Sequence, residues 1–241
     1  MKKILLPTII LLFLFSGMAF ADTASVAFEK GGEAYRNGDY TMAAEWFRKS
    51  AEQGDANGQL MLGALYYSGE GTPQNYAEAA KWYRKAAEQG NAAAQVSLGA
   101  MYQLGKGVPK NSAEAARWYR KSAEQGDADA QVMLGAMYQL GDGVPQNYAE
   151  AAKWFRKAAE QGDARAQNVL GRMYVIGAGV PQSYKHAYIW LSIAASNYEP
   201  GNQREKIIEK RDEAAKKLSS KQLEEAQKIA SEWRPKTEVN K

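Results

Sequence analysis

The chain has 241 residues, of which 31 are lysine or arginine, 27 are aspartate or glutamate, one is histidine and none is cysteine. The absence of cysteine excludes disulfides, thiolate metal sites and cysteine nucleophiles, and a single histidine argues against a histidine metal site or a Ser-His-Asp triad. A hydrophobic content of 45% with 24% charged residues argues against both a disordered chain and a polytopic membrane protein.

The first 21 residues have the pattern of a secretory signal peptide. Lys2 and Lys3 give a positive start, and residues 4–15 form an apolar run shorter than the roughly 20 residues of a membrane span. Ala19-Phe20-Ala21 then supplies an A-x-A cleavage site. The alternative is an uncleaved anchor. We predict cleavage after Ala21, a periplasmic or secreted bacterial protein, and no membrane span in the mature chain.

The mature chain loses two lysines, so its net charge falls from +4 to about +2. This small excess of positive charge does not provide the basic patch that binding of nucleic acid requires.

Residues 22–39 come next and are predicted to hold one leading helix. Gly32 and Tyr35 have the Gly-x-x-Tyr spacing of the later repeats, but only four residues separate Tyr35 from Tyr40, against nine between Tyr66 and Tyr76. We therefore expect a shortened turn here.

A 36-residue period without gaps dominates the next part of the chain. Tryptophan, glycine, tyrosine and proline each recur at this spacing. The tryptophans are Trp46, Trp82, Trp118, Trp154 and Trp190. The predicted complete units are 40–75, 76–111, 112–147 and 148–183, and residues 184–202 hold the first helix of a degenerate fifth unit. Such a period is the signature of a repeat architecture.

Each unit has the pattern of two antiparallel helices. In the second unit Asn75 is a good N-cap and Gly90 ends the first helix. Asn91 then begins a second helix with an apolar stripe. Gly99 lies in the middle of that helix, where glycine costs about 1 kcal/mol relative to alanine. Its recurrence indicates close helix packing, and because no unit can bury its stripe alone, the units must stack.

Residues 203–233 depart from the period and have the pattern of two charged helices, the second opened by a capping box of Ser219 and Gln222. They are predicted to form a C-terminal cap with a polar outer face. Residues 234–241 are predicted to be a flexible tail. In total we expect about 12 helices and no sheet.

The motif Leu62-Gly63-x-x-Tyr66 followed by Ala79-x-x-x-Tyr83 resembles the tetratricopeptide pattern. The longer unit, A-x-x-W-Y-R-K-A-A-E-Q-G with L-G-x-x-Y-x-x-G-x-G-x-P, resembles the Sel-1-like repeat family over residues 40–195. The resemblance implies an all-α, right-handed α-solenoid that acts as an adaptor or regulator. It implies no catalysis, no cofactor and no metal.

In tetratricopeptide proteins the L-G-x-x-Y helix lines the concave face, and the resemblance transfers this face to the second helix of each unit. The predicted binding residues are Leu60, Ala64, Tyr67, Val96, Ala100, Gln103, Val132, Ala136, Gln139, Asn168 and Arg172. Two of these positions, those of Leu60 and Tyr67, change between copies, while the buried signature barely changes. The next position on this face holds Ser68, Leu104, Leu140 and Ile176.

This face is apolar in the first three units and polar in the fourth, at Arg165, Asn168 and Arg172. We expect a peptide or loop of a partner protein there, with an acidic group near Arg172, because the guanidinium fork suits a carboxylate. The alternative is that neighbouring helices partly cover residues such as Val96 and Val132, and that Arg172 pairs with a carboxylate of the chain.

Our leading hypothesis is a regulatory periplasmic or secreted scaffold that binds an envelope or host protein through its concave face. The second is a peptidoglycan- or glycan-binding module with exposed tryptophans, although the tryptophan ladder has the spacing of a core or repeat interface. The third is a hydrolase, which the sequence disfavours because carboxylates such as Glu78 and Glu88 lie on solvated faces. A small-molecule ligand is not expected.

Overall fold

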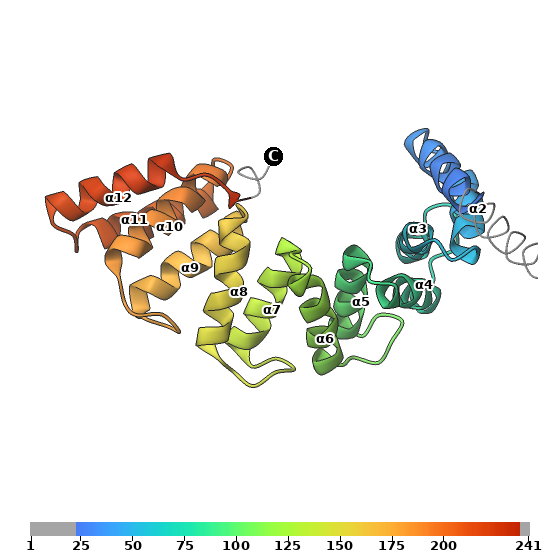
Figure 1. Cartoon of the computed structure of the whole chain (residues 1–241), viewed down its shortest axis with the longest axis horizontal. Helices are drawn as coiled ribbons and strands as arrows, with labels where there is room; N and C mark the ends of the chain where they lie inside the picture. The colour runs from blue at the N-terminus through green and yellow to red at the C-terminus, as the bar shows by residue number, and fades with distance from the viewer. Residues whose placement is uncertain (1–22, 237–241) are drawn as a thin grey trace, which may run out of the picture. The chain divides into compact units, whose positions relative to one another are not determined.

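The computed structural model describes residues 23–236, and in that range the chain forms twelve helices and no strand (Figure 1). The predicted signal peptide, its cleavage site after Ala21 and residues 237–241 lie outside the described residues. None of the helices between residues 23 and 236 has the length and apolar composition of a membrane span. The predicted all-α repeat fold is confirmed.

The chain divides into two compact units, residues 1–111 and residues 112–241. Unit 1 contains a leading helical segment, residues 23–36, and four further helices. These are α2 (Tyr40–Glu52), α3 (Ala56–Ser68), α4 (Tyr76–Glu88) and α5 (Ala92–Leu104). Unit 2 contains α6 (Ser112–Glu124), α7 (Ala128–Leu140), α8 (Tyr148–Glu160), α9 (Ala164–Ile176), α10 (Tyr184–Asn197), α11 (Asn202–Ala215) and α12 (Ser220–Glu232).

The helix boundaries follow from local capping. The side chain of Asn75 accepts bonds from the backbone amides of Ala77 and Glu78, and Asn91 accepts one from Ala94, as their N-cap roles predict. The predicted capping box of Ser219 and Gln222 opens α12. Each second helix of a repeat ends at a glycine with left-handed backbone, at Gly69, Gly105, Gly141 and Gly177.

The mid-helix glycines mark the tightest helix packing. A Cβ on Gly63 of α3 would lie 2.8 Å from Cδ1 of Tyr83 on α4, and one on Gly171 of α9 would lie 2.7 Å from Cγ of Leu191 on α10. The second helix of a predicted unit therefore packs closely against the first helix of the next one, as α3 does against α4 in unit 1 and α9 against α10 in unit 2. Close packing continues across these two repeat boundaries.

The leading segment uses a different glycine from the one that the sequence alignment indicated. A Cβ on Gly31 would lie 2.6 Å from Cδ1 of Phe47, whereas one on Gly32 would meet only the end of the Arg36 side chain, at 3.5 Å. Gly31 is therefore the structural equivalent of Gly63 in the leading segment, and the match of Gly32 to Gly63 was wrong by one residue. The shortened turn before Tyr40 changes the register of the segment against α2.

A set of buried glutamines joins neighbouring helix pairs. Gln131 is 2% exposed. Its Nε2 donates to the carbonyl of Ala123 at 3.1 Å, and its Oε1 accepts from Gln161 at 2.9 Å. Gln59 in unit 1 makes the same two kinds of bond, with Ala51 and Gln89. Both polar atoms of each glutamine side chain therefore have a hydrogen-bond partner, and the side chain links one helix pair to the next.

We expect Gln131→Leu to lower the free energy of unfolding by about 1–2 kcal/mol, because Ala123 and Gln161 each lose a buried partner. Urea unfolding followed by circular dichroism measures this change. Gln139→Leu, on the half-buried outer face of the same helix, is the matched control and is expected to change stability by less than about 0.5 kcal/mol. Equal losses in the two variants would contradict the structural role of the buried amide.

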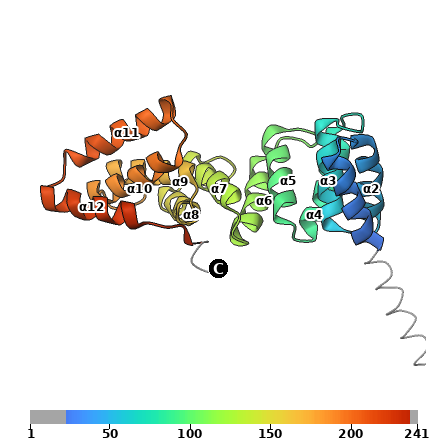
Figure 2. The ribbon, with the colours of Figure 1, turned by 90° about the horizontal axis from the view of Figure 1, so that it is seen from above.

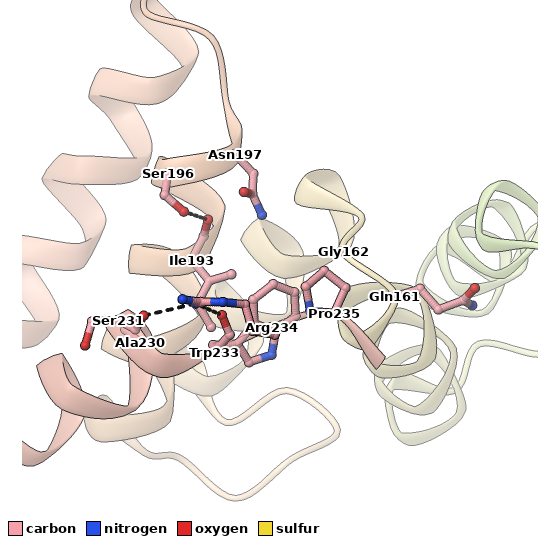
Figure 3. Close-up of a pocket in the computed structure, with 10 residues that line it drawn as sticks. All are labelled: Gln161, Gly162, Ile193, Ser196, Asn197, Ala230, Ser231, Trp233, Arg234 and Pro235. Atoms are coloured by element: carbon pink, nitrogen blue, oxygen red, sulfur yellow. Dashed lines mark hydrogen bonds between the residues drawn. The ribbon is translucent and has the colours of Figure 1, made fainter. Parts of the chain in front are cut away.

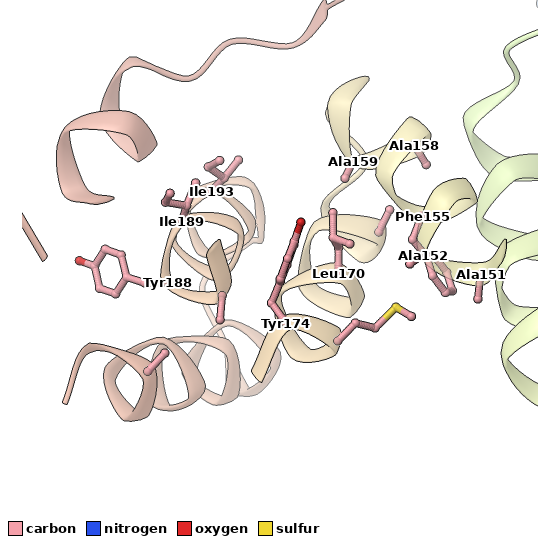
Figure 4. Packing of buried hydrophobic residues seen from close by; sticks show 14 of the residues in the cluster. Ala151, Ala152, Phe155, Ala158, Ala159, Leu170, Tyr174, Tyr188, Ile189 and Ile193 are labelled. Atoms are coloured by element: carbon pink, nitrogen blue, oxygen red, sulfur yellow. The ribbon is translucent and has the colours of Figure 1, made fainter. Parts of the chain in front are cut away.

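In unit 2, α11 and α12 lie beside α10 (Figures 1 and 2). The hydrophobic cluster there joins α8, α9 and α10 through residues such as Phe155, Leu170 and Tyr188 (Figure 4). The cap contributes Ala214 of α11 and Ala226 of α12 to the same cluster. Most other residues of α11 and α12 are exposed, as a cap with a polar outer face requires.

The first described residues of the predicted tail contact unit 2. Pro235 lies against Gly162, with Cγ 3.4 Å from the Cβ position of that glycine. Lys236 forms an ion pair with Glu160. These contacts place residues 234–236 on the surface of unit 2 instead of in a free tail.

Candidate functional site

Six predicted binding residues lie in unit 1, on one face each of α3 and α5, because they are spaced four and three residues apart. All six are half-buried. They are Leu60, Ala64 and Tyr67 on α3, and Val96, Ala100 and Gln103 on α5. We call these six residues, together with the five of unit 2 described below, the binding face.

Tyr67 is the best-anchored residue of this face in unit 1. Its ring meets that of Tyr76 on α4 edge-on, with centroids 5.1 Å apart. The ammonium of Lys106, in the loop after α5, donates to the Tyr67 hydroxyl at 3.0 Å and lies 5.0 Å from both ring centroids. The hydrogen bond to Tyr67 raises the pKa of Lys106 above its ordinary value. The sequence analysis missed Lys106, since Asp142 and Ala178 occupy its place in the later copies.

The other five predicted residues lie in unit 2, on α7 and α9. They are Val132, Ala136 and Gln139 on α7, and Asn168 and Arg172 on α9. Val132 and Ala136 are half-buried and pack against the cluster of Figure 4, so neighbouring helices partly cover them. This agrees with the alternative interpretation of the apolar positions.

The two arginines of α9 differ in their partners. Arg165 bonds to Asp163 at 2.6 Å and to Asp129, and these hydrogen bonds raise its pKa. Arg172 is exposed and has no hydrogen bond or ion pair within residues 23–236. The alternative that Arg172 pairs with a carboxylate of the described chain is therefore not observed, and its guanidinium is available to a ligand.

Arg172 and Asn168 line a pocket of about 250 Å³ together with side chains of α11. The α11 residues are Gln203, Lys206, Ile207, Glu209 and Lys210. We call this the α9–α11 pocket. Sequence reasoning placed α11 in a cap and missed its contribution to the site, because α11 lies outside the 36-residue period.

Three exposed aliphatic side chains occupy the last position of successive second helices. Leu104 is 61% exposed in unit 1, and Leu140 and Ile176 are 74% and 73% exposed in unit 2. They end α5, α7 and α9, one residue before the terminating glycine. Each of these exposed side chains offers an apolar contact to another molecule at the same position of its repeat.

Four of the tryptophans are poorly placed to stack on a sugar. Trp82 and Trp118 are each 8% exposed. A lysine three residues further along the helix lies over one face of the rings of Trp46, Trp82, Trp118 and Trp154, as Lys85 does over Trp82 at 4.2 Å. Each ammonium group occupies a ring face that a sugar could use.

A second and larger pocket lies at the end of the cap in unit 2 (Figure 3). Its volume is about 610 Å³, and its lining comes from the end of α10, the end of α12 and the turn at Gln161 and Gly162. Arg234 is its single charged lining residue, and this guanidinium already donates to the carbonyls of Ser231 and Trp233. Part of the donor capacity of the one charged group in this pocket is therefore already used within the chain.

The single histidine has a structural position. His186 Nδ1 lies 2.9 Å from the hydroxyl of Ser183, the N-cap of α10, and its ring stacks on Tyr174 at 5.0 Å. Burial, followed by the nearby charges of Arg156 and Lys185, lowers the pKa of His186. In the part of the chain that the structure describes, no three histidine, aspartate or glutamate side chains gather closely enough to hold a metal ion.

The comparisons with known proteins agree with this arrangement. The profile of the Sel1 repeat family matches residues 24–55, 56–91, 92–127, 128–163 and 164–198. Each matched repeat after the first starts with a second helix of our predicted units and takes in the first helix of the next. In the repeats 56–91 and 164–198 these two helices are the pair that the mid-helix glycine brings close together. The first match includes the leading segment. No curated protein matches the chain.

Among solved structures, a Sel1 repeat protein from Oxalobacter formigenes is 33% identical, with a TM-score of 0.69. The match covers 80% of this chain and 86% of that one. The protective antigen c5321 of uropathogenic Escherichia coli is 30% identical, with a TM-score of 0.38, over 91% of this chain and 62% of that one. Helicobacter pylori cysteine rich protein B is 30% identical, with a TM-score of 0.36, over 36% of this chain and 66% of that one.

Proposed function

Because the chain belongs to the Sel1 repeat family, we propose that it is a scaffold that binds a peptide or loop of another protein through its binding face. Sel1 repeat proteins are generally protein-interaction scaffolds, and their fold is typically non-enzymatic. The observation that carries the proposal for this chain is the repeated exposure of Leu104, Leu140 and Ile176 on the helices that hold the binding face.

We further propose that the scaffold acts in the periplasm or outside the cell, where its binding regulates an envelope or host protein. The support is the charged start, apolar run and A-x-A site within residues 1–21. A peptide or loop is the favoured occupant, because within each unit the face is built from single side chains of two second helices, which suits an extended chain.

The test combines Val96→Lys and Val132→Lys, one change in each unit. We expect the double variant to bind the partner at least about tenfold more weakly, because a lysine replaces an apolar contact. The variant and wild-type residues 22–241 are immobilised and exposed to a native envelope extract. Any protein retained by the wild type is purified, and its affinity for both forms is measured by calorimetry.

The matched control is Ser97→Lys with Met133→Lys, which adds the same charges one residue along on the same two helices. Ser97 and Met133 are half-buried like their neighbours but lie about 100° around the helix. We expect the control to retain binding and all three forms to share one helical circular dichroism spectrum. Equal affinity of the wild type and the valine variant would reject the binding face.

A further inference from the structure

We infer that the α9–α11 pocket is a carboxylate subsite that receives an aspartate, a glutamate or the C-terminal carboxylate of the bound peptide. This inference rests on the proposed function and deepens it, because it makes α11 part of the binding machinery and names the chemistry of the partner. The subsite lies wholly within unit 2.

The charge of the pocket favours an anion. Arg172, Lys206 and Lys210 line it, and Glu209 is its single acidic lining residue, so the lining carries a net charge of about +2. Lys210 shares its charge with Glu213, at 2.8 Å. Arg172 and Lys206 have no hydrogen bond or ion pair within the described residues, so their donors can turn to a ligand.

Two other cations of unit 2 are already paired with carboxylates. Arg165 bonds to Asp163 and Asp129, and Lys185 bonds to Glu225 at 2.6 Å. The pocket differs from these places because Arg172 and Lys206, which both line it, keep their donors free. An arginine fork and an ammonium together can bind both oxygens of one carboxylate.

The start of α11 adds to the positive electrostatic potential of the pocket. Gln203, the second residue of the helix, lines the pocket, and the N-cap Gly201 supplies no side-chain bond to the first amides of α11. The positive end of the helix dipole therefore lies close to the Gln203 end of the pocket lining and favours a negative group there.

The size of the pocket favours a peptide side chain over a drug-sized small molecule. About 250 Å³ is below the usual volume of small-molecule sites, which is roughly 300–1,000 Å³. A peptide carboxylate fits this space while the rest of the peptide continues along α9. Asn168, Arg172 and Ile176 follow at four-residue spacing, so Ile176 lies one helical turn beyond Arg172 on the same face. A peptide that carries an apolar residue next to the acidic one would cover Ile176.

The experiment selects random twelve-residue peptides displayed on phage against wild-type residues 22–241. We expect the selected peptides to share an acidic position next to an apolar one. The affinity of the strongest selected peptide, made synthetically, is then measured by calorimetry for Arg172→Ala, Lys206→Ala, Glu209→Gln and Lys217→Ala.

Arg172→Ala and Lys206→Ala should each weaken binding about tenfold, and replacement of the acidic residue of the peptide by its amide should remove this difference. Glu209→Gln should tighten binding about two- to threefold, because it removes a like charge beside the carboxylate. Lys217→Ala is the matched control: it removes the same charge from the end of the α11 segment, outside the pocket, and should leave affinity unchanged.

The outcomes separate the subsite from the proposed function. Selected peptides without an acidic position, or equal affinity of wild type and Lys206→Ala, would overturn the subsite and leave peptide binding intact. Equal weakening by Lys206→Ala and Lys217→Ala would show a general charge effect and would also overturn it. If the wild type selects no peptide at all, the proposed function fails and the subsite with it.

Discussion

Gly107→Ala is expected to lower the free energy of unfolding by about 3–4 kcal/mol. Gly107 has φ +69°, and a Cβ there would lie 2.1 Å from the carbonyl oxygen of Tyr76 and 2.3 Å from its carbon. Left-handed backbone costs an alanine about 1–2 kcal/mol, and the overlap adds more because the atoms it meets belong to the backbone at the start of α4. Urea unfolding followed by circular dichroism measures the loss.

Gly90→Ala separates the cost of the left-handed backbone from the cost of the steric overlap. Gly90 also has a left-handed backbone, with φ +93°, but a Cβ there would have no atom within 4 Å. We expect a loss of only about 1 kcal/mol for this control. The same close approach recurs at Gly71 with Tyr40 and at Gly179 with Tyr148. The missing side chain of the loop glycine therefore lets the turn pass close to the backbone at the start of an earlier helix. Equal losses at Gly107 and Gly90 would contradict this account.

The second prediction compares two adjacent glycines of the leading segment. Gly31→Ala should destabilise the chain by about 1–3 kcal/mol, because the new methyl group overlaps the ring of Phe47. That ring is 1% exposed and lies 5.6 Å from the ring of Phe28, so it has little room to move. Thermal unfolding followed by circular dichroism measures the effect.

Gly32→Ala is expected to have the opposite sign. Its Cβ would meet only the flexible end of Arg36, so the better helix propensity of alanine should stabilise the chain by about 0.5–1 kcal/mol. The sequence alignment of Gly32 with Gly63 predicts the reverse order. A larger loss at Gly32 than at Gly31 would therefore favour the alignment over the observed packing.

The candidate site was predicted in part. The spacing of Leu60, Ala64 and Tyr67 along one helix is a local property, and repetition transferred it to the later copies. No local rule could show that Lys106 reaches Tyr67, 39 residues earlier, or that Lys206 of α11 shares a pocket with Arg172 of α9. Those contacts depend on how helices pack, and α11 has no counterpart in the period from which to transfer them.

The sequence by itself determined the repeat architecture of this protein. Caps such as Asn75 and terminating glycines such as Gly105 act within a few residues, so the pattern alone predicted where the helices begin and end. The repeated mid-helix glycine likewise predicted close packing. The tertiary structure alone decided which helix each glycine meets, which glutamines pair, and that α11 completes the face of α9. The physical reason is that these contacts join segments about 20 to 40 residues apart, whose register depends on the turns between them and on the side chains that fill the space.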